Sequence, residues 1–217
     1  MNISQINRSV KAYATRLFAS PYRSDGRLVD FSISHLLAMQ KRQEAIALMK
    51  RIRRLAPSVL LEIGTAGGGS LVLLCSAAPA NATLITVDLP RRLGGYHWTK
   101  VPLYRSFARQ HQKLHLVRGD SHADATFAEV CQHLRNRPVD FLLIDGDHRY
   151  EGARCDFQLY SPLVRPGGVI AFHDIRPHFR PDIKVDLLWH ELLSLYRHEE
   201  LIADANSNGY GIGLLYV

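Results

Sequence analysis

Short apolar runs alternate with helix-like segments along the chain from Ser58 onward. The apolar, β-branched runs predict strands at Val59–Ile63, Thr83–Asp88, Leu114–Arg118, Val139–Asp145, Val169–His173 and Tyr210–Val217. The segments between them predict helices near Gly69–Ala78, Tyr104–Gln112, Ala123–Asn136, Tyr150–Leu163 and Ile183–Tyr196. A run such as Phe141–Ile144 is apolar at every position, as in strands that are buried on both faces. The alternation therefore predicts a doubly wound α/β domain.

The two ends of the chain complete this picture. The turn-forming residues Asn206–Gly209 predict a tight turn and a closing hairpin before the last strand. Residues 1–57 contain no such strands, so we expect a basic helical extension that caps the sheet or covers a pocket. The α/β domain is expected at residues 58–217.

The positive charge of the chain is concentrated near its start. The net charge is +7, and residues 1–54 hold 11 Lys and Arg against 3 Asp and Glu. This segment could bind nucleic acid or another anion. The interpretation that we favour is a solvated helix face, because apolar residues form a stripe opposite the charges: Ala45, Ile46, Leu48, Met49, Ile52 and Leu55.

Length and composition limit the class of protein. The chain has 217 residues, enough for one full core, and no apolar run approaches the roughly 20 residues that cross a bilayer. We therefore expect no membrane partner. The three cysteines, Cys75, Cys131 and Cys155, are odd in number and widely spaced, which indicates reduced thiols and a cytoplasmic protein.

Acidic residues stand at or just after the carboxyl end of every predicted strand except the last. They are Glu62, Asp88, Asp120, Asp145, Asp147 and Asp174. In an open α/β sheet these ends form the ligand site. The first strand runs into the glycine-rich loop at Gly64–Ser70, which lacks both the dinucleotide G-x-G-x-x-G spacing and the Gly-Lys-Ser/Thr of a phosphate loop. An acid beside the loop would repel a pyrophosphate and favours a cationic group, although a plain helix-entry turn could also be rich in glycine.

Two further acids limit the kind of ligand that this site could bind. Asp88 follows the second strand, where a carboxylate can bind both hydroxyls of a ribose. Asp120 and Ser121 follow the third strand and offer a carboxylate and a hydroxyl to an adenine amino group. An adenosine that carries a sulfonium and an amino-acid tail would satisfy all three places.

Several motifs resemble one enzyme family over about residues 40–217. They are Glu62–Ser70, Asp88, Gly119–Ser121, Asp145–Gly152 and Arg165–Asp174. Together they resemble class I S-adenosylmethionine-dependent methyltransferases, in particular the catechol and caffeoyl-CoA type and the cephalosporin-hydroxylase-like and macrocin-type group. The resemblance implies a Rossmann-like, doubly wound, seven-stranded, mostly parallel sheet with an antiparallel last strand.

The resemblance also implies a role for each matching residue toward S-adenosylmethionine. Glu62 and Ser70 would hold its methionine part, and Gly64, Ala66 and Gly68 would admit its backbone. Asp88 would bind the ribose, Asp120 and Ser121 the adenine, and Asp145 would lie beside the cofactor. In catechol-type relatives the metal ligands occupy the places of Asp145, His173 and Asp174. The usual Asp-Asn or acidic pair reads His173-Asp174 here.

The fourth and fifth strand ends indicate the reaction. Neighbouring strands lie about 4.8 Å apart, so Asp145 and Asp174 can converge on Mg²⁺ or another divalent ion. His148 and Asp147 are the candidate bases, with His148 favoured because an imidazole titrates near neutral pH. This loop could instead be a structural turn whose acids cap the next helix.

These inferences predict O-methyl transfer to a hydroxyl of a small molecule or natural product. The resemblance also implies a homodimer, because many members of the family are dimers. Acceptor specificity is expected in residues 89–102, 175–182 and the N-terminal extension. One alternative is a nucleic-acid methyltransferase that uses the basic N-terminal segment. Another is different chemistry on the same fold, because a fold does not fix a function.

Overall fold

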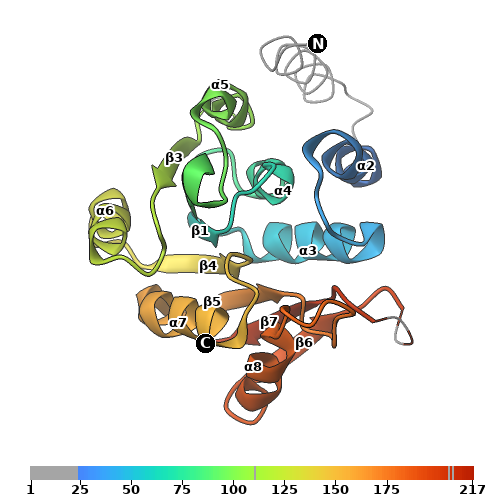
Figure 1. Ribbon diagram of the computed structural model, residues 1–217. Coiled ribbons are helices and arrows are strands. Elements are labelled where there is room, and N and C mark those ends of the chain that lie inside the picture. Colours follow the sequence, from blue (N-terminus) through green and yellow to red (C-terminus); the bar gives the residue numbers. More distant parts are fainter. Residues whose placement is uncertain (1–23, 110, 205, 207) are drawn as a thin grey trace.

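A single seven-stranded sheet forms the centre of the computed structural model, which describes residues 24–109, 111–204, 206 and 208–217 (Figure 1). The strand order is β3-β2-β1-β4-β5-β7-β6. The strands are β1 (Val59–Ile63), β2 (Thr83–Asp88), β3 (Lys113–Arg118), β4 (Val139–Ile144), β5 (Val164–His173), β6 (Arg197–Leu201) and β7 (Ile212–Tyr216). Strands β1 to β5 pair in parallel, and β7 is antiparallel to β5 and β6. The Rossmann-like, doubly wound sheet is therefore confirmed.

The C-terminal hairpin differs from its prediction in two ways. Its first strand, β6, was missed because its sequence is Arg-His-Glu-Glu-Leu, which is charged at an exposed sheet edge instead of apolar. The connection spans residues 202–211 between paired Leu201 and Ile212, so the hairpin is present and its connection is longer than a tight turn. Ser207 of that predicted turn lies outside the described residues.

Helices cover both faces of the sheet. They are α2 (Asp25–Leu36), α3 (Arg42–Leu55), α4 (Gly69–Ala77), α5 (Val101–Arg105), α6 (Asp124–Leu134), α7 (Tyr150–Tyr160) and α8 (Val185–Leu192), with single 3-10 turns η1 (Arg91–Leu93), η2 (Trp98–Lys100) and η3 (Ser161–Leu163). The helix predicted at Tyr104–Gln112 was wrong in its bounds, since α5 ends at Arg105. The Gln112 side chain instead bonds the Arg109 N–H and the Cys75 carbonyl, which holds this segment as a turn (Gln110 lies outside the described residues).

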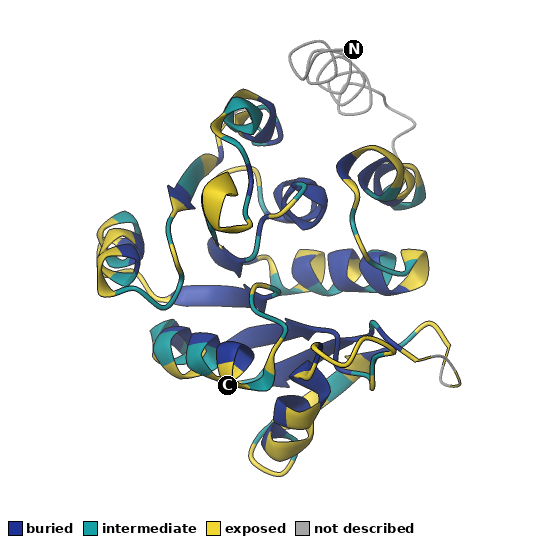
Figure 2. Ribbon diagram, viewed as in Figure 1, coloured by how far each residue is buried: buried dark blue, intermediate teal, exposed yellow. Residues whose placement is uncertain are grey.

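Successive residues of the central strands point alternately into two separate hydrophobic cores, one on each face of the sheet. Leu60, Leu84 and Phe141 pack with α2, α3, α4 and α5 on one face of the sheet. Leu61 and Leu142 pack with α6, α7 and α8 on the other face. Figure 2 shows the central strands buried throughout, with exposed residues on the outer sides of the helices. Helix α4 is buried along its whole length, which places the glycine-rich loop that precedes it on a rigid base.

The basic N-terminal helices contribute to the first of these cores. The predicted stripe on α3 is buried at Ala45, Leu48, Met49 and Ile52. Three arginines of this segment form ion pairs within the chain: Arg42 with Asp30, Arg51 with Glu199, and Arg53 with Asp25. This arrangement supports the solvated-face interpretation. No helix among the described residues is long and apolar enough to cross a membrane.

One buried carboxylate joins α3 to the β6–β7 connection. Glu44 is 1% exposed and accepts the N–H groups of Ala203 at 2.9 Å and Gly211 at 3.1 Å. We expect Glu44→Ala to lower the free energy of unfolding by about 1–3 kcal/mol, because it leaves the buried Gly211 N–H and the part-buried Ala203 N–H without an acceptor. Urea denaturation measures this change. Glu44→Gln keeps one acceptor and should lose about half as much, whereas a loss no larger than that of the exposed Arg53→Ala would contradict the prediction.

Candidate functional site

The glycine-rich loop touches its neighbours through the main chain. Gly64 has φ +100°, and a methyl group added to it would overlap the backbone carbonyl of Asp145. The N–H of Asp145 donates in turn to the Ile63 carbonyl at 2.8 Å. A methyl group on Gly67 would overlap the Leu36 carbonyl at the end of α2. Contacts within the protein therefore require both glycines, in addition to the ligand approach and the helix-entry turn that the sequence suggested.

Asp88, at the end of β2, holds the glycine-rich loop from the side. Its Oδ2 accepts the Ala66 N–H at 2.5 Å and its Oδ1 accepts the Leu89 N–H at 2.6 Å. Burial raises the pKa of this carboxyl, against the opposing effect of those N–H groups. The Tyr104 hydroxyl donates to the Ala66 carbonyl at 2.6 Å, so both backbone groups of Ala66 are fixed. A carboxylate can accept about four hydrogen bonds, so Asp88 keeps acceptor capacity for a ligand.

Glu62 lies beneath the loop and is 1% exposed. Its Oε2 accepts the Thr86 hydroxyl at 2.6 Å, while its Oε1 has no hydrogen-bond partner among the described residues. Burial raises the pKa of Glu62 to about 8. The carboxyl does not line either hollow described below.

The raised pKa of Glu62 predicts a pH-dependent stability. Between pH 4.5 and about 8 the folded protein holds a proton that the unfolded chain has lost, so the free energy of unfolding falls as pH rises through this window. Each unit of pKa shift is about 1.4 kcal/mol, so the fall should reach several kcal/mol. Urea unfolding at pH 5 and pH 8.5 should show this fall to be much smaller in Glu62→Gln. If the free energy of unfolding falls equally in both proteins, Glu62 is not the group responsible.

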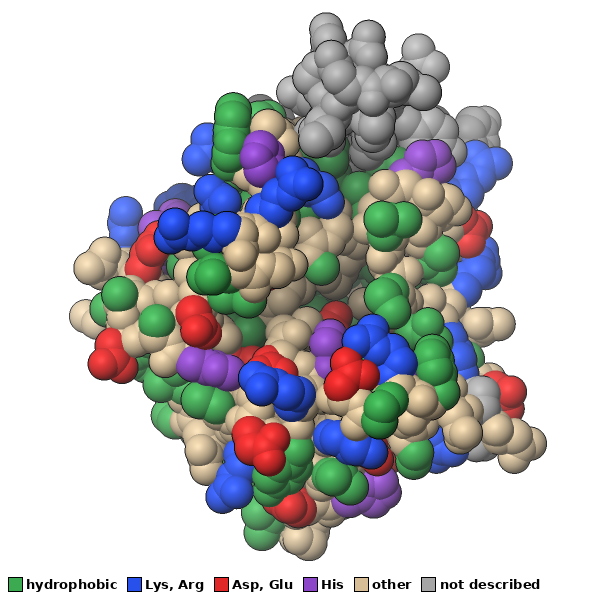
Figure 3. All heavy atoms as spheres, viewed as in Figure 1, with side chains coloured by type: hydrophobic (Ala, Val, Ile, Leu, Met, Phe, Trp, Pro, Cys, Tyr) green, Lys and Arg blue, Asp and Glu red, His purple; other side chains and the backbone are tan. Residues whose placement is uncertain are grey.

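Two hollows meet at the carboxyl ends of the strands. The first is lined by Asp88, Gly94, Asp120, Ser121 and Asp147, among others. The second lies between the α2–α3 connection and the segment after β5, and its lining includes Leu37, Met39, Ser70, His178, Arg180 and Tyr210. Gly64, Ala66, Asp145 and His148 line both. In Figure 3 acidic and histidine side chains gather near the middle of the face in view.

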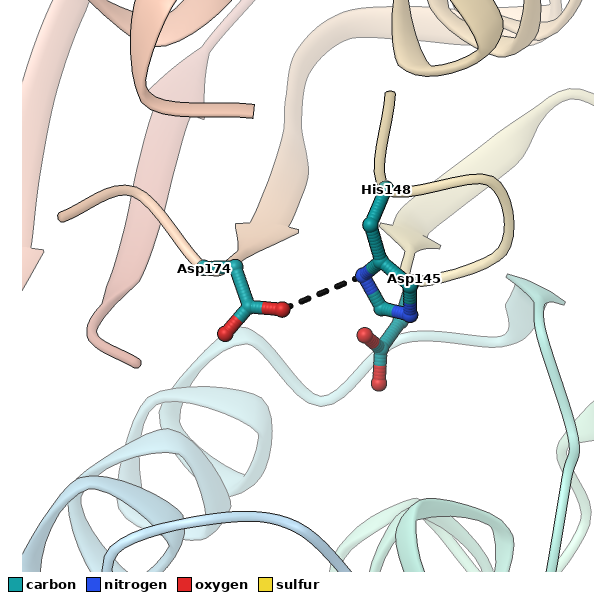
Figure 4. Close-up of side chains that lie close together, drawn as sticks. All are labelled: Asp145, His148 and Asp174. Carbon is teal, nitrogen blue, oxygen red and sulfur yellow. Dashed lines mark ion pairs between the residues drawn. The ribbon is translucent and has the colours of Figure 1, made fainter. Parts of the chain in front are cut away.

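Asp145, His148 and Asp174 converge where the two hollows join. Their ligand atoms lie within 4.8 Å of one another, and Figure 4 shows the three side chains turned toward a common point. His148 Nδ1 lies 3.1 Å from Asp174 Oδ2. That contact raises the pKa of His148, although burial opposes it. Burial alone would raise the pKa of Asp174, but His148 and His173 hold it far below its ordinary value.

His173 lies behind this cluster and is 4% exposed. Its Nδ1 lies 3.3 Å from Asp145 Oδ1 and 3.2 Å from Asp174 Oδ1. Burial lowers the pKa of this ring, but the two carboxylates raise it well above its ordinary value. The group whose ligand atoms all lie within 4.8 Å of one another therefore includes His148, while His173, which contacts both carboxylates, stays a predicted ligand.

Asp147 and Asp120 lie on the side of the first hollow. Asp147 forms a bidentate ion pair with Arg149, which lowers its pKa, and it does not line the second hollow. Asp120 is exposed, and its Oδ1 accepts the His122 N–H at 3.0 Å. Thr65 and Tyr210 also line the second hollow and were not predicted, because no sequence motif distinguishes their side chains. His178 and Arg180 fall in one of the loops where acceptor specificity was expected.

The sequence matches the family model Methyltransf_24, described as a methyltransferase domain, over residues 61–175. The chain belongs to this methyltransferase family. The match begins inside β1 and ends just after Asp174, so it contains the glycine-rich loop and the whole cluster of Asp145, His148 and Asp174. The resemblance found in the sequence motifs is confirmed.

Solved structures and curated proteins resemble this methyltransferase more distantly. An O-methyltransferase from Bacillus cereus in complex with SAH gives a TM-score of 0.60 at 17% identity, covering 96% of this chain and 97% of that one. A putative caffeoyl-CoA O-methyltransferase from Staphylococcus aureus gives 0.63 at 18%, covering 94% and 98%. Demethylmacrocin O-methyltransferase of Streptomyces fradiae is 30% identical over 113 residues, 46% of this chain and 28% of that protein. The matches span only 14% to 52% of the curated relatives' lengths.

Proposed function

We propose that this methyltransferase transfers the methyl group of S-adenosylmethionine to a hydroxyl oxygen of a small molecule. The observation that carries the proposal is the junction of the two hollows at Asp145 and His148. A cofactor in the first hollow and an acceptor in the second would meet there. Holding the two reactants in line is the main contribution that such a protein makes to the rate.

The first hollow has the groups that adenosine needs. Asp88 would accept the two ribose hydroxyls, and Asp120 with Ser121 would bind the adenine amino group. Gly64, Ala66, Gly68 and Ser70 would bind the methionine part along the start of α4. Glu62 would act from beneath the loop: it is mostly protonated in the free protein because burial raises its pKa, and a bound cationic sulfonium or amino group would favour its ionised form.

The methionine part would reach the second hollow at Ser70, and the rest of that hollow would hold the acceptor. Leu37, Met39 and Tyr210 give it apolar surface, which suits an organic molecule that carries a hydroxyl. His148 lines both hollows, and we propose that it is the general base that accepts the proton of the acceptor hydroxyl. Asp147 is a weaker candidate base, because its carboxylate is paired with Arg149 and lies away from this hollow.

The residues at the junction fit a divalent ion. Two carboxylates, Asp145 and Asp174, and one imidazole offer ligand atoms within reach of one another, a donor set that suits Mg²⁺ or a first-row transition metal. Such an ion would lower the pKa of a bound hydroxyl. Asp145 and Asp174 would hold it, and His173 would position both carboxylates from behind.

Calorimetric titration with S-adenosylhomocysteine, with and without Mg²⁺, tests the cofactor half of the proposal. We expect micromolar binding. Methyl transfer from labelled S-adenosylmethionine to a panel of hydroxylated small molecules then tests the acceptor half. If S-adenosylhomocysteine binds neither with nor without Mg²⁺, the proposed function is wrong.

A further inference from the structure

A fully buried carboxylate lies beneath the floor of the first hollow. Asp156, on α7, is 0% exposed and lines neither hollow. Its Oδ1 lies 3.2 Å from Nε2 of His122, in the β3–α6 loop that follows Asp120 and Ser121. Its Oδ2 faces Gly146 in the β4–α7 loop, where an added Cβ would come within 3.4 Å. The carboxylate therefore lies between two loops that form the hollow.

The same helix contacts the β3–α6 loop a second time. Tyr160 lies one helical turn after Asp156, and its hydroxyl donates to the Ser121 carbonyl at 2.8 Å. Residues four apart share one face of a helix, so both side chains point toward the loop. On the other side of the loop, Asp120 is exposed.

A carboxylate at this position is expected to lower the free energy of unfolding. Burial raises the pKa of Asp156, against the opposing effects of the Ser121 hydroxyl and His122. The polar side-chain groups that face it are the Ser121 hydroxyl and the His122 ring. A buried charge in such surroundings is costly, and an apolar residue of similar size often gives a more stable protein. Its contact with His122 therefore suggests a role in orienting the loop.

We propose that Asp156 is a positioning residue which, through His122 and together with Tyr160, holds Asp120 and Ser121 in the conformation that binds adenine. This inference rests on the proposed function, since it assumes that the first hollow holds adenosine. Asp156 would not touch the cofactor. It would select for the 6-amino group of adenine by keeping the exposed Asp120 carboxylate in place.

The test compares two ligands that differ at that amino group. S-inosylhomocysteine carries an oxygen in place of the 6-amino group of S-adenosylhomocysteine. We expect the unmodified protein to prefer S-adenosylhomocysteine about tenfold in calorimetric Kd, the discrimination given by one hydrogen bond of about 1.4 kcal/mol. Asp156→Asn should lose most of this preference by weakening only the adenine ligand. Tyr160→Phe should lose less, and Cys155→Ser, on the same helix, should lose none.

Two further measurements keep the inference testable. If Asp156→Asn does not fold, His122→Gln breaks the same contact from a partly exposed side chain and should reduce the preference in the same way. Hydrogen exchange at residues 120–123, measured without cofactor, should be faster in Asp156→Asn or His122→Gln. Unchanged preference or unchanged exchange in a folded variant would overturn the positioning role. Failure of the unmodified protein to bind either ligand, with faster exchange in the variant, would overturn the proposed function alone.

Discussion

Gly64→Ala is expected to abolish binding of S-adenosylhomocysteine and to lower the free energy of unfolding by about 3–5 kcal/mol. Two effects add at this position. The backbone has φ +100°, which a residue with a Cβ adopts only under strain, and the new methyl group would overlap the Asp145 carbonyl. Strands β1 and β4 pair directly at this point, so neither can move aside without losing sheet hydrogen bonds. Urea denaturation and calorimetry measure the two losses.

Gly94→Ala is the matched control for this prediction. Gly94 has φ +107°, close to that of Gly64, but nothing lies within 4 Å of an added Cβ. It should therefore show the backbone strain alone, about 1–2 kcal/mol. A Gly64→Ala variant that is no less stable than Gly94→Ala would show that the contact with Asp145 does not matter. The difference between the two variants measures that contact.

The parts of the fold that the sequence predicts are those that local patterns determine. Phe141–Ile144 is apolar at every position because both faces of β4 are buried, and the strand was found where it was expected. Strand β6 could not be found in this way. Its charged residues face solvent or pair with α3, as Glu199 does with Arg51, and that pairing joins residues far apart in the sequence.

The candidate site, too, could be predicted from the sequence only in part. The order of acids along the chain predicts which strand ends face the ligand, because parallel strands end at one edge of the sheet. It does not predict how consecutive side chains point. Asp174 has φ +61°, so the chain turns after His173, and both side chains approach Asp145 instead of alternating across the sheet. Nor does any local pattern reveal that Leu36 lies against Gly67.

Asp145→Asn should reduce methyl transfer by at least about 10²–10³-fold, a loss typical for one electrostatic group at a reacting centre. Its carboxylate lines both hollows and belongs to the cluster that could hold a divalent ion. The amide has nearly the same shape, so the fold should remain. Turnover with labelled S-adenosylmethionine measures the effect, and Mg²⁺ titration of the protein, followed by calorimetry, should show the weaker metal binding without any need for activity.

Three companion variants separate the roles at this centre. Asp147→Asn removes a carboxylate two residues away that faces only the first hollow, and it should change turnover far less. Asp174→Asn should match Asp145→Asn in both turnover and Mg²⁺ affinity. His148→Gln should lower turnover about 10²–10⁴-fold, as loss of a general base does, while leaving Mg²⁺ affinity nearly unchanged. If Mg²⁺ affinity falls as far in His148→Gln as in Asp174→Asn, His148 is a ligand, and the acceptor proton must go to another group.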